Sequence, residues 1–169
     1  WNGMNKLFSV HNKTFLITGG LGQIGLALLK YLIDNNAIIA VVEKKSQIEI
    51  SKIIKKNPYL KYKKLKIFNY DISNKNIIEK NFNKIIKFLS KIDVLINLAA
   101  IDSKPYGKKK NYNLKFHNFP LKIIKRSIDV NLIVTLIFSQ IVCKYFIKNK
   151  IEGNIINIAS SYSLLAPNL

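Results

Sequence analysis

Short β-branched segments alternate with longer amphipathic segments along the chain, and this alternation constrains the fold more than any other feature. Strands are predicted at 14–18, 37–42, 66–70, 93–99 and 154–160, and helices at 22–36, 46–57, 74–91 and 120–149, with a polar loop at 101–118. The strand at 37–42 is continuously apolar, as a strand covered on both faces requires. We therefore predict an α/β fold: a doubly wound parallel sheet in the order 3-2-1-4-5, with helices on both faces and right-handed crossovers.

Glycines gather where the first predicted strand meets the first predicted helix. Residues 20–25, GLGQIG, match G-x-G-x-x-G, which in this strand-to-helix context predicts a Rossmann-type dinucleotide site. Gly20 is expected to allow a tight turn, Gly22 to let the backbone approach a pyrophosphate, and Gly25 to let the helix pack closely. The N–H groups and the positive dipole end of that helix would face the phosphates. A glycine-rich turn without a ligand is the alternative.

The end of the second predicted strand carries an acidic residue, Glu43. A carboxylate at this place accepts hydrogen bonds from the adenosine ribose hydroxyls and repels a 2′-phosphate, which favours NAD over NADP. Lys44 and Lys45 follow directly and would soften this preference, so NADP is the less favoured alternative.

The strong positive charge of the chain has two explanations. The sequence holds 28 basic and 9 acidic residues, which give a net charge of +19, and Arg126 is the one basic residue that is not lysine. Such a charge suggests a polyanionic partner such as nucleic acid. Because dedicated nucleic-acid surfaces usually include arginine for bidentate contacts, we favour lysines that lie on solvated faces.

Several features bear on compartment and chemistry. Cys143 is the single cysteine, which excludes an internal disulfide and fits a reducing compartment. Its apolar helical surroundings predict a buried structural thiol rather than a nucleophile.

No secretory pattern opens the chain, and polar residues interrupt its most apolar stretch at 131–146. A cytoplasmic protein without a membrane partner is predicted. No metal site is expected, because no cluster of His, Cys and carboxylates has ligand spacing.

From about Lys13 to its last residue, the chain resembles the short-chain dehydrogenases/reductases. TGGLGQIG at 18–25 resembles the glycine loop of that family, although Gln23 stands where the commonest form has glycine. YDIS at 70–73, NLAA at 97–100, DVNL at 129–132 and GNIINIASS at 153–161 resemble four further motifs, with Leu98 and Ala100 as departures. Together with AAIDSKP at 99–105 and SLLAPN at 163–168, these motifs are also similar to those of family members found among bacterial surface-carbohydrate and flagellin-modification genes.

The resemblance implies roles for individual residues. Asp71 would contact the adenine ring, Asn131 would hold a water in a proton relay, and Ser160 would fix the reacting carbonyl or carbinol; a one-residue shift would make Ser161 the catalytic serine. Taken alone, Asn131 is better explained as a buried side chain that hydrogen-bonds to the backbone, and Ser160 equally well by capping a strand end. The residues that the resemblance assigns to cofactor binding are Thr18, Gly19, Gly20, Gly22, Gln23, Ile24, Gly25, Glu43, Asp71, Ile72, Asn97 and Ala99.

The resemblance also implies an activity: NAD(P)-dependent hydride transfer between a secondary alcohol and a ketone, in a full-length protein that forms a homo-oligomer. The family's acid/base motif, Tyr-x-x-x-Lys, would begin past residue 169. Internal matches at Tyr59/Lys63, Tyr62/Lys66 and Tyr106/Lys110 precede the fifth predicted strand and are attributed to chance. We therefore expect residues 1–169 to form a single NAD(P)-binding domain that is incomplete at its C-terminus, lacks the last strands and is inactive by itself.

Two alternatives of other classes remain open from the sequence. One is a dinucleotide-binding module without catalysis, which a continuation of the reading frame into Tyr-x-x-x-Lys would exclude. The other, less favoured, is a basic nucleic-acid-binding protein, which a steep salt dependence of oligonucleotide binding would support.

Overall fold

The computed structural model describes residues 9–101, 117 and 119–160 of the chain. Within this part a five-stranded sheet has the order β3-β2-β1-β4-β5, and every neighbouring pair is parallel. The strands are β1 (Thr14–Thr18), β2 (Ile38–Glu43), β3 (Leu65–Asn69), β4 (Val94–Asn97) and β5 (Asn154–Asn157). The predicted parallel sheet and its strand order are confirmed. β4 and β5 end earlier than predicted, because their parallel pairing stops at Asn97 and Asn157.

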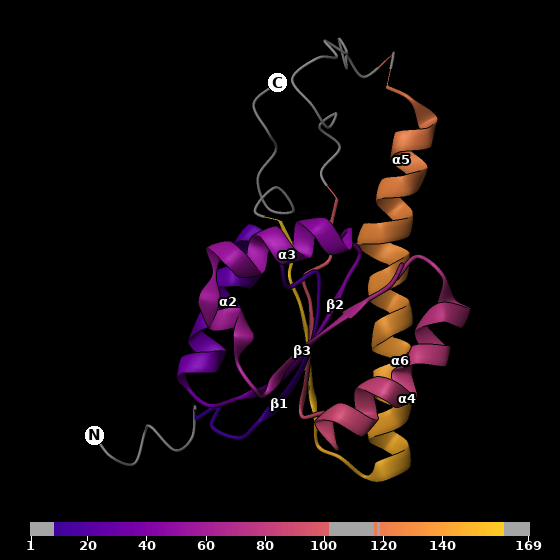
Figure 1. The fold of residues 1–169 in the computed structure, drawn as a ribbon. Helices are drawn as coiled ribbons and strands as arrows, with labels where there is room; N and C mark the ends of the chain where they lie inside the picture. The colour runs from indigo at the N-terminus through magenta and orange to yellow at the C-terminus, as the bar shows by residue number, and fades with distance from the viewer. Residues whose placement is uncertain (1–8, 102–116, 118, 161–169) are drawn as a thin grey trace.

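Helices cover both faces of this sheet (Figure 1). On one face lie α2 (Gln23–Asp34), α3 (Gln47–Lys56) and the 3₁₀ turn η1 (Pro58–Lys61), and on the other lie α4 (Lys75–Leu89) and α6 (Val134–Asn149). Each side has its own apolar core, one built around Ile17, Leu29 and Val41 and the other around Leu16, Ile85 and Phe138. Alternate residues of β1 point into the two cores, which is why the strand is buried throughout and its three central residues are apolar.

Local sequence signals explain where the helices begin and end. Ser46 and Glu49 form a capping box at the start of α3, in which each side chain accepts from the backbone N–H of the other. α3 ends at Lys56, two residues before Pro58, close to the end predicted from that proline. At the start of α4, the Asn74 side chain accepts from the N–H groups of Asn76 and Ile77.

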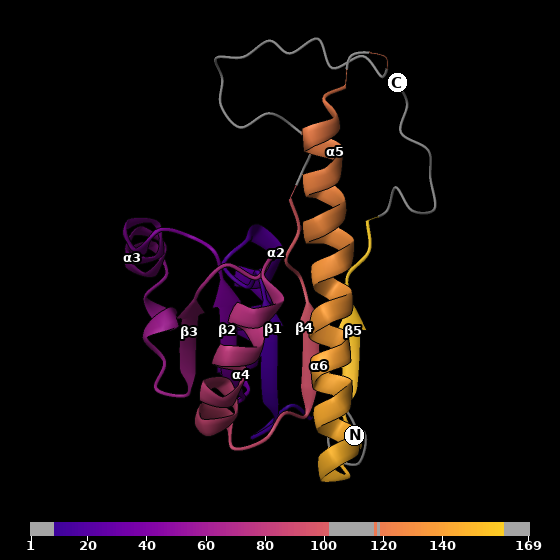
Figure 2. The ribbon, with the colours of Figure 1, turned by 90° about the vertical axis from the view of Figure 1, so that its right-hand side faces the viewer.

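The helix predicted at 120–149 is interrupted by a π-helical turn. α5 (Leu121–Ile128) leads into the turn η3 (Asp129–Ile133), which leads into α6 without a break. A π turn inserts one residue into the helical ladder and is frequent at functional sites. Figure 2 shows α6 beside the sheet and α5 projecting past the carboxyl ends of the strands, and α5 has no buried residue.

One side of α6 docks on the sheet and the other is exposed. The buried side chains follow helical spacing: Val134, Phe138, Val142 and Phe146. Cys143, expected to be a buried thiol, is exposed, because it lies one residue past Val142 and therefore off this buried stripe. By length and composition the helix Leu121–Asn149 could also cross a membrane, a criterion that core helices of soluble proteins meet as well.

A polar link joins the start of β1 to the start of β4. The Asp93 carboxylate accepts hydrogen bonds of 2.9 Å from both the backbone N–H and the hydroxyl of Thr14, and Lys91 lies 2.8 Å from it. Partial burial opposes ionisation of Asp93, but the hydrogen bonds from Lys91 and Thr14 outweigh it and lower the pKa of Asp93 below its ordinary value of 3.8. The ionised form is therefore the one that the folded chain stabilises.

We expect Asp93→Ala to lower the free energy of unfolding by about 1–3 kcal/mol at pH 7, because two buried donors of Thr14 lose their acceptor. A carboxyl with a lowered pKa stabilises the fold above its ordinary pKa and loses this effect as the pH falls through the lowered value. The difference between wild type and variant should therefore shrink below about pH 4 in urea titrations. Asp34→Ala, which removes an exposed partner of Lys30, is the control and should change stability by less than about 0.5 kcal/mol.

Candidate functional site

A cavity of about 400 Å³ opens at the carboxyl edge of the sheet, between the ends of β1, β2 and β4 and the start of the long helix. The strand order reverses between β1 and β4, and ligands of open α/β sheets bind at such a point. Six of the residues predicted to bind a cofactor line this cavity: Gly19, Gly22, Glu43, Asp71, Ile72 and Ala99. The topology thus brings three separate sequence motifs to one place.

The glycine loop is shaped by close backbone approaches. Gly19 has a left-handed backbone, with φ of +69°, and a Cβ there would lie 2.6 Å from the Cα of Ala99. Gly19 therefore passes directly against the end of β4, while Gly20 lies in the tight turn predicted there, which the hydrogen bond from the Gly22 N–H to the Gly19 carbonyl closes. A Cβ on Gly25 would lie 2.3 Å from the Gly20 carbonyl oxygen, so α2 can pack on the loop only with glycine there.

Gly22 differs from these two glycines, because its side faces open space. A Cβ at Gly22 would meet nothing closer than the Gly19 oxygen at 3.6 Å, and the residue lines the cavity. It is also the N-cap of α2, whose first turn receives no hydrogen bond from a capping side chain. The N–H groups of that turn are directed at the cavity end of the helix, where an anion is favoured.

The buried side chain of Glu43 holds this loop through a hydrogen bond to its backbone. Its carboxylate accepts from the N–H of Leu21 at 3.1 Å and from its neighbour Lys44 at 3.0 Å, and the residue is only 7% exposed. Lys45 lies 3.7 Å from the same carboxylate. Each carboxylate oxygen has a second lone pair, so Glu43 retains acceptor capacity toward the cavity that it lines.

Asp71 closes the cavity from the end of β3. Its carboxylate accepts from the N–H and the hydroxyl of Ser73, at 2.9 and 2.7 Å, and forms an ion pair with Lys44. Partial burial opposes ionisation, but these hydrogen bonds outweigh it and lower the pKa of Asp71 below its ordinary value. Asp71 is therefore a fixed anion at neutral pH, and Lys44 is held beside it.

The end of β4 is held by amide and hydroxyl contacts. Asn97 is buried, and its amide N–H₂ donates to Ser139 at 3.2 Å and to Asn157 at 2.8 Å. Its carbonyl oxygen has no hydrogen-bond partner within the described residues. Thr18, also buried, accepts from the N–H of Ala99 at 3.3 Å. Asn97 and Thr18 therefore do not line the cavity. Thr18 holds Ala99, which does line it.

Asn131 lies in the π turn η3 and hydrogen-bonds to the backbone of the chain after β4. Its side chain accepts from the N–H of Ile101 at 2.9 Å and donates to the Ile101 carbonyl at 3.1 Å. This is the backbone bonding that the residue by itself suggested, although Asn131 is exposed rather than buried, and it holds a cavity-lining residue in place. Ser160 is exposed and follows β5, outside the cavity lining; Ser161 lies outside the described residues.

Three further residues that were predicted to bind the cofactor do not line the cavity, and neither do two tyrosines of the internal Tyr-x-x-x-Lys matches. Gly20 packs against Val41, while Gln23 and Ile24 are exposed on the first turn of α2. Tyr59 and Tyr62 donate their hydroxyls to the Leu26 carbonyl and to Asn36, which accounts for both without the cavity. The remaining Tyr-x-x-x-Lys match, Tyr106/Lys110, lies outside the described residues.

Sequence reasoning missed part of the cavity wall. Arg126, Asp129 and Val130 line the cavity from the long helix. Asp129 and Val130 belong to the DVNL motif, in which only Asn131 was assigned a role, and Arg126 lies three and four residues before them on the same helical face. Among the described residues, no group of three or more His, Cys, Asp or Glu side chains could hold a metal ion.

The described geometry agrees with comparisons to known proteins. The model of the short chain dehydrogenase family matches residues 13–168, and the chain belongs to this family. It is 28% identical to post-translational flagellin modification protein A of Campylobacter coli and 30% identical to 5-keto-D-gluconate 5-reductase of Escherichia coli, over 94% and 96% of this chain. It spans 59% of the length of each.

Solved structures show the same fold. A short chain dehydrogenase from Leptospira borgpetersenii with bound NAD⁺ superposes with a TM-score of 0.77 at 22% identity. The match covers 95% of this chain and 56% of that one.

Proposed function

We propose that this chain is the cofactor-binding part of an oxidoreductase that transfers hydride between NAD and a secondary alcohol or ketone. The observation that carries the proposal is the convergence of the glycine loop, Glu43 and Asp71 on one cavity at the point where the strand order reverses. The alternative of a glycine-rich turn without a ligand does not explain why Gly22 leaves open space on the cavity side.

The residues fit a dinucleotide. The first turn of α2 would receive the pyrophosphate, since Gly22 adds no side chain and the helix end favours an anion. Glu43 would accept from the ribose hydroxyls and Asp71 from the adenine amine. When bound, NAD supplies the hydride chemistry, and the protein supplies position and electrostatics.

The proposed catalytic groups of this chain are Asn131 and Ser160. Asn131 already holds Ile101 at the edge of the cavity, from which it would order a water in a proton relay. Ser160 follows the end of β5 and would orient the substrate oxygen. No tyrosine lines the cavity within the described residues, so we place the general acid/base outside them.

The substrate class is proposed from the relatives. 5-Keto-D-gluconate 5-reductase acts on a keto sugar acid, and the flagellin modification protein also matches this chain. We infer that the substrate is a polyhydroxylated small molecule of surface-carbohydrate metabolism, since one relative is named for a keto sugar acid and the other for the modification of a surface protein. NADP as the cofactor, a dinucleotide-binding module without catalysis and a nucleic-acid-binding protein are the alternatives.

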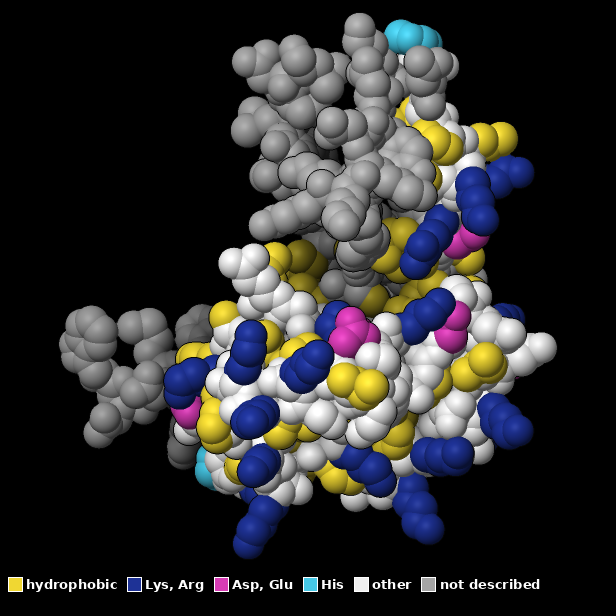
Figure 3. All heavy atoms as spheres, turned by 45° about the horizontal axis from the view of Figure 1, so that its top comes forward, with side chains coloured by type: hydrophobic (Ala, Val, Ile, Leu, Met, Phe, Trp, Pro, Cys, Tyr) yellow, Lys and Arg dark blue, Asp and Glu magenta, His cyan; other side chains and the backbone are white. Residues whose placement is uncertain are grey.

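Nucleic-acid binding is disfavoured by how the charge is distributed. Figure 3 shows basic side chains over most of the visible face, some of them adjacent, rather than confined to one part of that face. A homo-oligomer is proposed through the long helix, whose exposed apolar residues include Leu132, Ile133 and Leu136. We propose a cytoplasmic location, and we treat residues 1–169 as one domain.

The cofactor preference tests the proposal. NAD should bind more tightly than NADP, and Glu43→Gln should narrow the difference about tenfold, because it removes the negative charge while keeping an acceptor for the Leu21 N–H. Glu43→Ala should weaken NAD binding further, since the loop then loses that acceptor. Fluorescence titration of both cofactors measures these affinities. Glu79→Ala, exposed on α4, is the control, and wild-type protein that binds neither cofactor would refute the proposal.

A further inference from the structure

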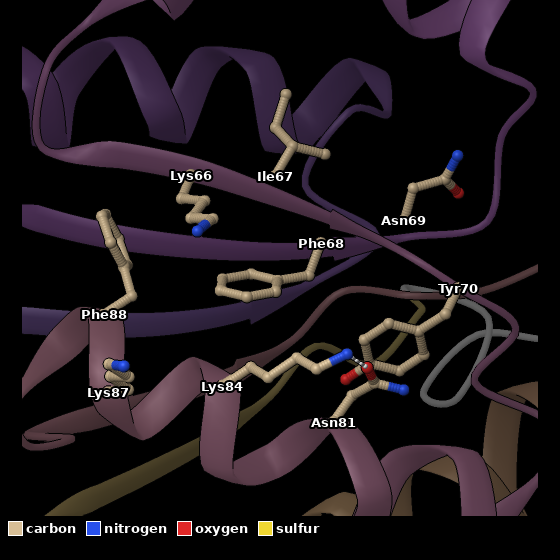
Figure 4. Close-up of a pocket in the computed structure, with 9 residues that line it drawn as sticks. All are labelled: Lys66, Ile67, Phe68, Asn69, Tyr70, Asn81, Lys84, Lys87 and Phe88. Carbon is tan, nitrogen blue, oxygen red and sulfur yellow. Dashed lines mark hydrogen bonds between the residues drawn. The ribbon is translucent and has the colours of Figure 1, made fainter.

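A second hollow lies at the outer edge of the sheet, away from the cofactor cavity. It has a volume of about 650 Å³ and runs between β3 and α4. We call it the β3–α4 groove. Figure 4 shows the nine residues that line it: Lys66, Ile67, Phe68, Asn69, Tyr70, Asn81, Lys84, Lys87 and Phe88.

The charge of the β3–α4 groove is entirely positive. Lys66, Lys84 and Lys87 line it, and no carboxylate does. None of these lysines forms an ion pair with a described residue, whereas Lys44 and Lys45 in the cofactor cavity both have a carboxylate partner. Three cationic side chains around one hollow repel each other, and an anion in the hollow would relieve that repulsion.

The ammonium group of Lys66 is held in position by aromatic rings. It lies 5.3 Å from the ring centre of Phe68 and 5.7 Å from that of Phe88, and the two rings meet edge to face. Lys84 is likewise oriented, since its ammonium donates to the Asn81 side chain at 3.2 Å. These contacts leave further donors on both ammonium groups for a ligand.

A buried hydroxyl in the same wall has no partner. The Tyr70 ring points from the end of β3 toward α4 (Figure 4), and its hydroxyl is buried without a hydrogen bond to any described residue. Burial raises the pKa of Tyr70 above its ordinary value, so the hydroxyl stays protonated and remains a donor. Buried polar groups are nearly always paired, so this donor indicates a missing acceptor.

Protection of the sheet edge explains only part of this arrangement. β3 is an edge strand, and a lysine on an edge strand discourages pairing with other chains, which accounts for Lys66. It does not account for Lys84 and Lys87 on α4 or for the unpaired Tyr70 hydroxyl.

We propose that the β3–α4 groove binds a small molecule that carries two or more adjacent phosphate groups. Lys66, Lys84 and Lys87 supply the positive charge, and the Tyr70 hydroxyl donates to a phosphate oxygen. The site is independent of the cofactor cavity, with which it shares no lining residue.

Calorimetric titration with inorganic tripolyphosphate, at an ionic strength of about 0.15 M, tests the proposal. The double variant Lys84→Gln/Lys87→Gln should weaken binding about tenfold or more, because two charge-assisted contacts are lost. Tyr70→Phe keeps the charge and should still weaken binding about threefold, an effect that general electrostatic attraction would not produce. Inorganic phosphate, with its single phosphate group, should bind more weakly than tripolyphosphate.

Lys52→Gln/Lys55→Gln on α3 is the matched control, with the same spacing on a helix that covers the other face of the sheet. It should leave the affinity within about twofold of wild type. Equal losses of tripolyphosphate affinity in the two double variants would overturn the proposal, because they would show that the ligand is attracted by the overall charge of +19. A wild-type affinity for tripolyphosphate in Lys84→Gln/Lys87→Gln or in Tyr70→Phe would also overturn the proposal. Circular dichroism of each variant verifies the fold.

Discussion

Replacing Gly19 with alanine should lower the free energy of unfolding by about 3 kcal/mol or more. A Cβ there would lie 2.6 Å from the Ala99 Cα and 2.8 Å from its nitrogen, which are backbone atoms that cannot rotate away. The left-handed backbone of Gly19 adds about 1–2 kcal/mol for any residue with a side chain. Urea unfolding followed by circular dichroism measures the loss.

Gly22→Ala is the companion variant, because its new Cβ would meet only ordinary contact at 3.6 Å. Stability should fall by no more than about 1 kcal/mol. NAD affinity, however, should fall about tenfold or more, since the added methyl group occupies space at the end of α2 where we propose that the pyrophosphate binds. If Gly22→Ala binds NAD as wild type does, the pyrophosphate does not lie there; if Gly19→Ala is fully stable, the close approach to β4 is incorrect.

Phe138→Ala should cost about 3–5 kcal/mol of stability. Phe138 is fully buried on α6 and belongs to the core that joins this helix to α4 and to the sheet. Its removal leaves a cavity that neighbouring rings and isoleucines fill only in part. Thermal and urea unfolding should both show the loss.

Leu136→Ala, two residues earlier on the same helix, is the matched control. Leu136 is 50% exposed, so its truncation should change monomer stability by less than about 0.5 kcal/mol. Similar losses for the two variants would show that α6 does not dock through the stripe of Val134, Phe138, Val142 and Phe146. A loss of self-association in Leu136→Ala alone would support the proposed oligomer surface.

Much of the fold was predictable because its signals are local. The continuous apolar run at 37–42 predicted a strand covered on both faces, and β2 is buried between the two cores. The glycine motif between a strand and a helix predicted the site at the carboxyl edge, where the cavity lies. Both signals depend on backbone preferences and side-chain alternation, which neighbouring residues set.

The errors came from contacts between distant segments. The steric need for glycine at position 19 was not predicted, because it depends on the close approach of Ala99, far along the chain. Cys143 is exposed because only one stripe of an apolar helix faces the sheet, and composition does not say which. The sequence did not show that Arg126, Asp129 and Val130 line the cavity, since this depends on where α5 and η3 pass it.

The sequence by itself determined the parallel α/β fold and the position of the glycine motif, because the alternation of strand and helix periods and the glycines between a strand and a helix are typical of this class of sheet, whose strand order is 3-2-1-4-5. Only the tertiary structure decided that Glu43 supports the Leu21 N–H, that Lys44 is paired with Asp71, and that Asn131 grips the backbone of Ile101. It also brought Lys66 and Tyr70 together with Lys84 and Lys87 in one groove. Such pairings depend on distances between segments remote in sequence, which packing sets and no local pattern records.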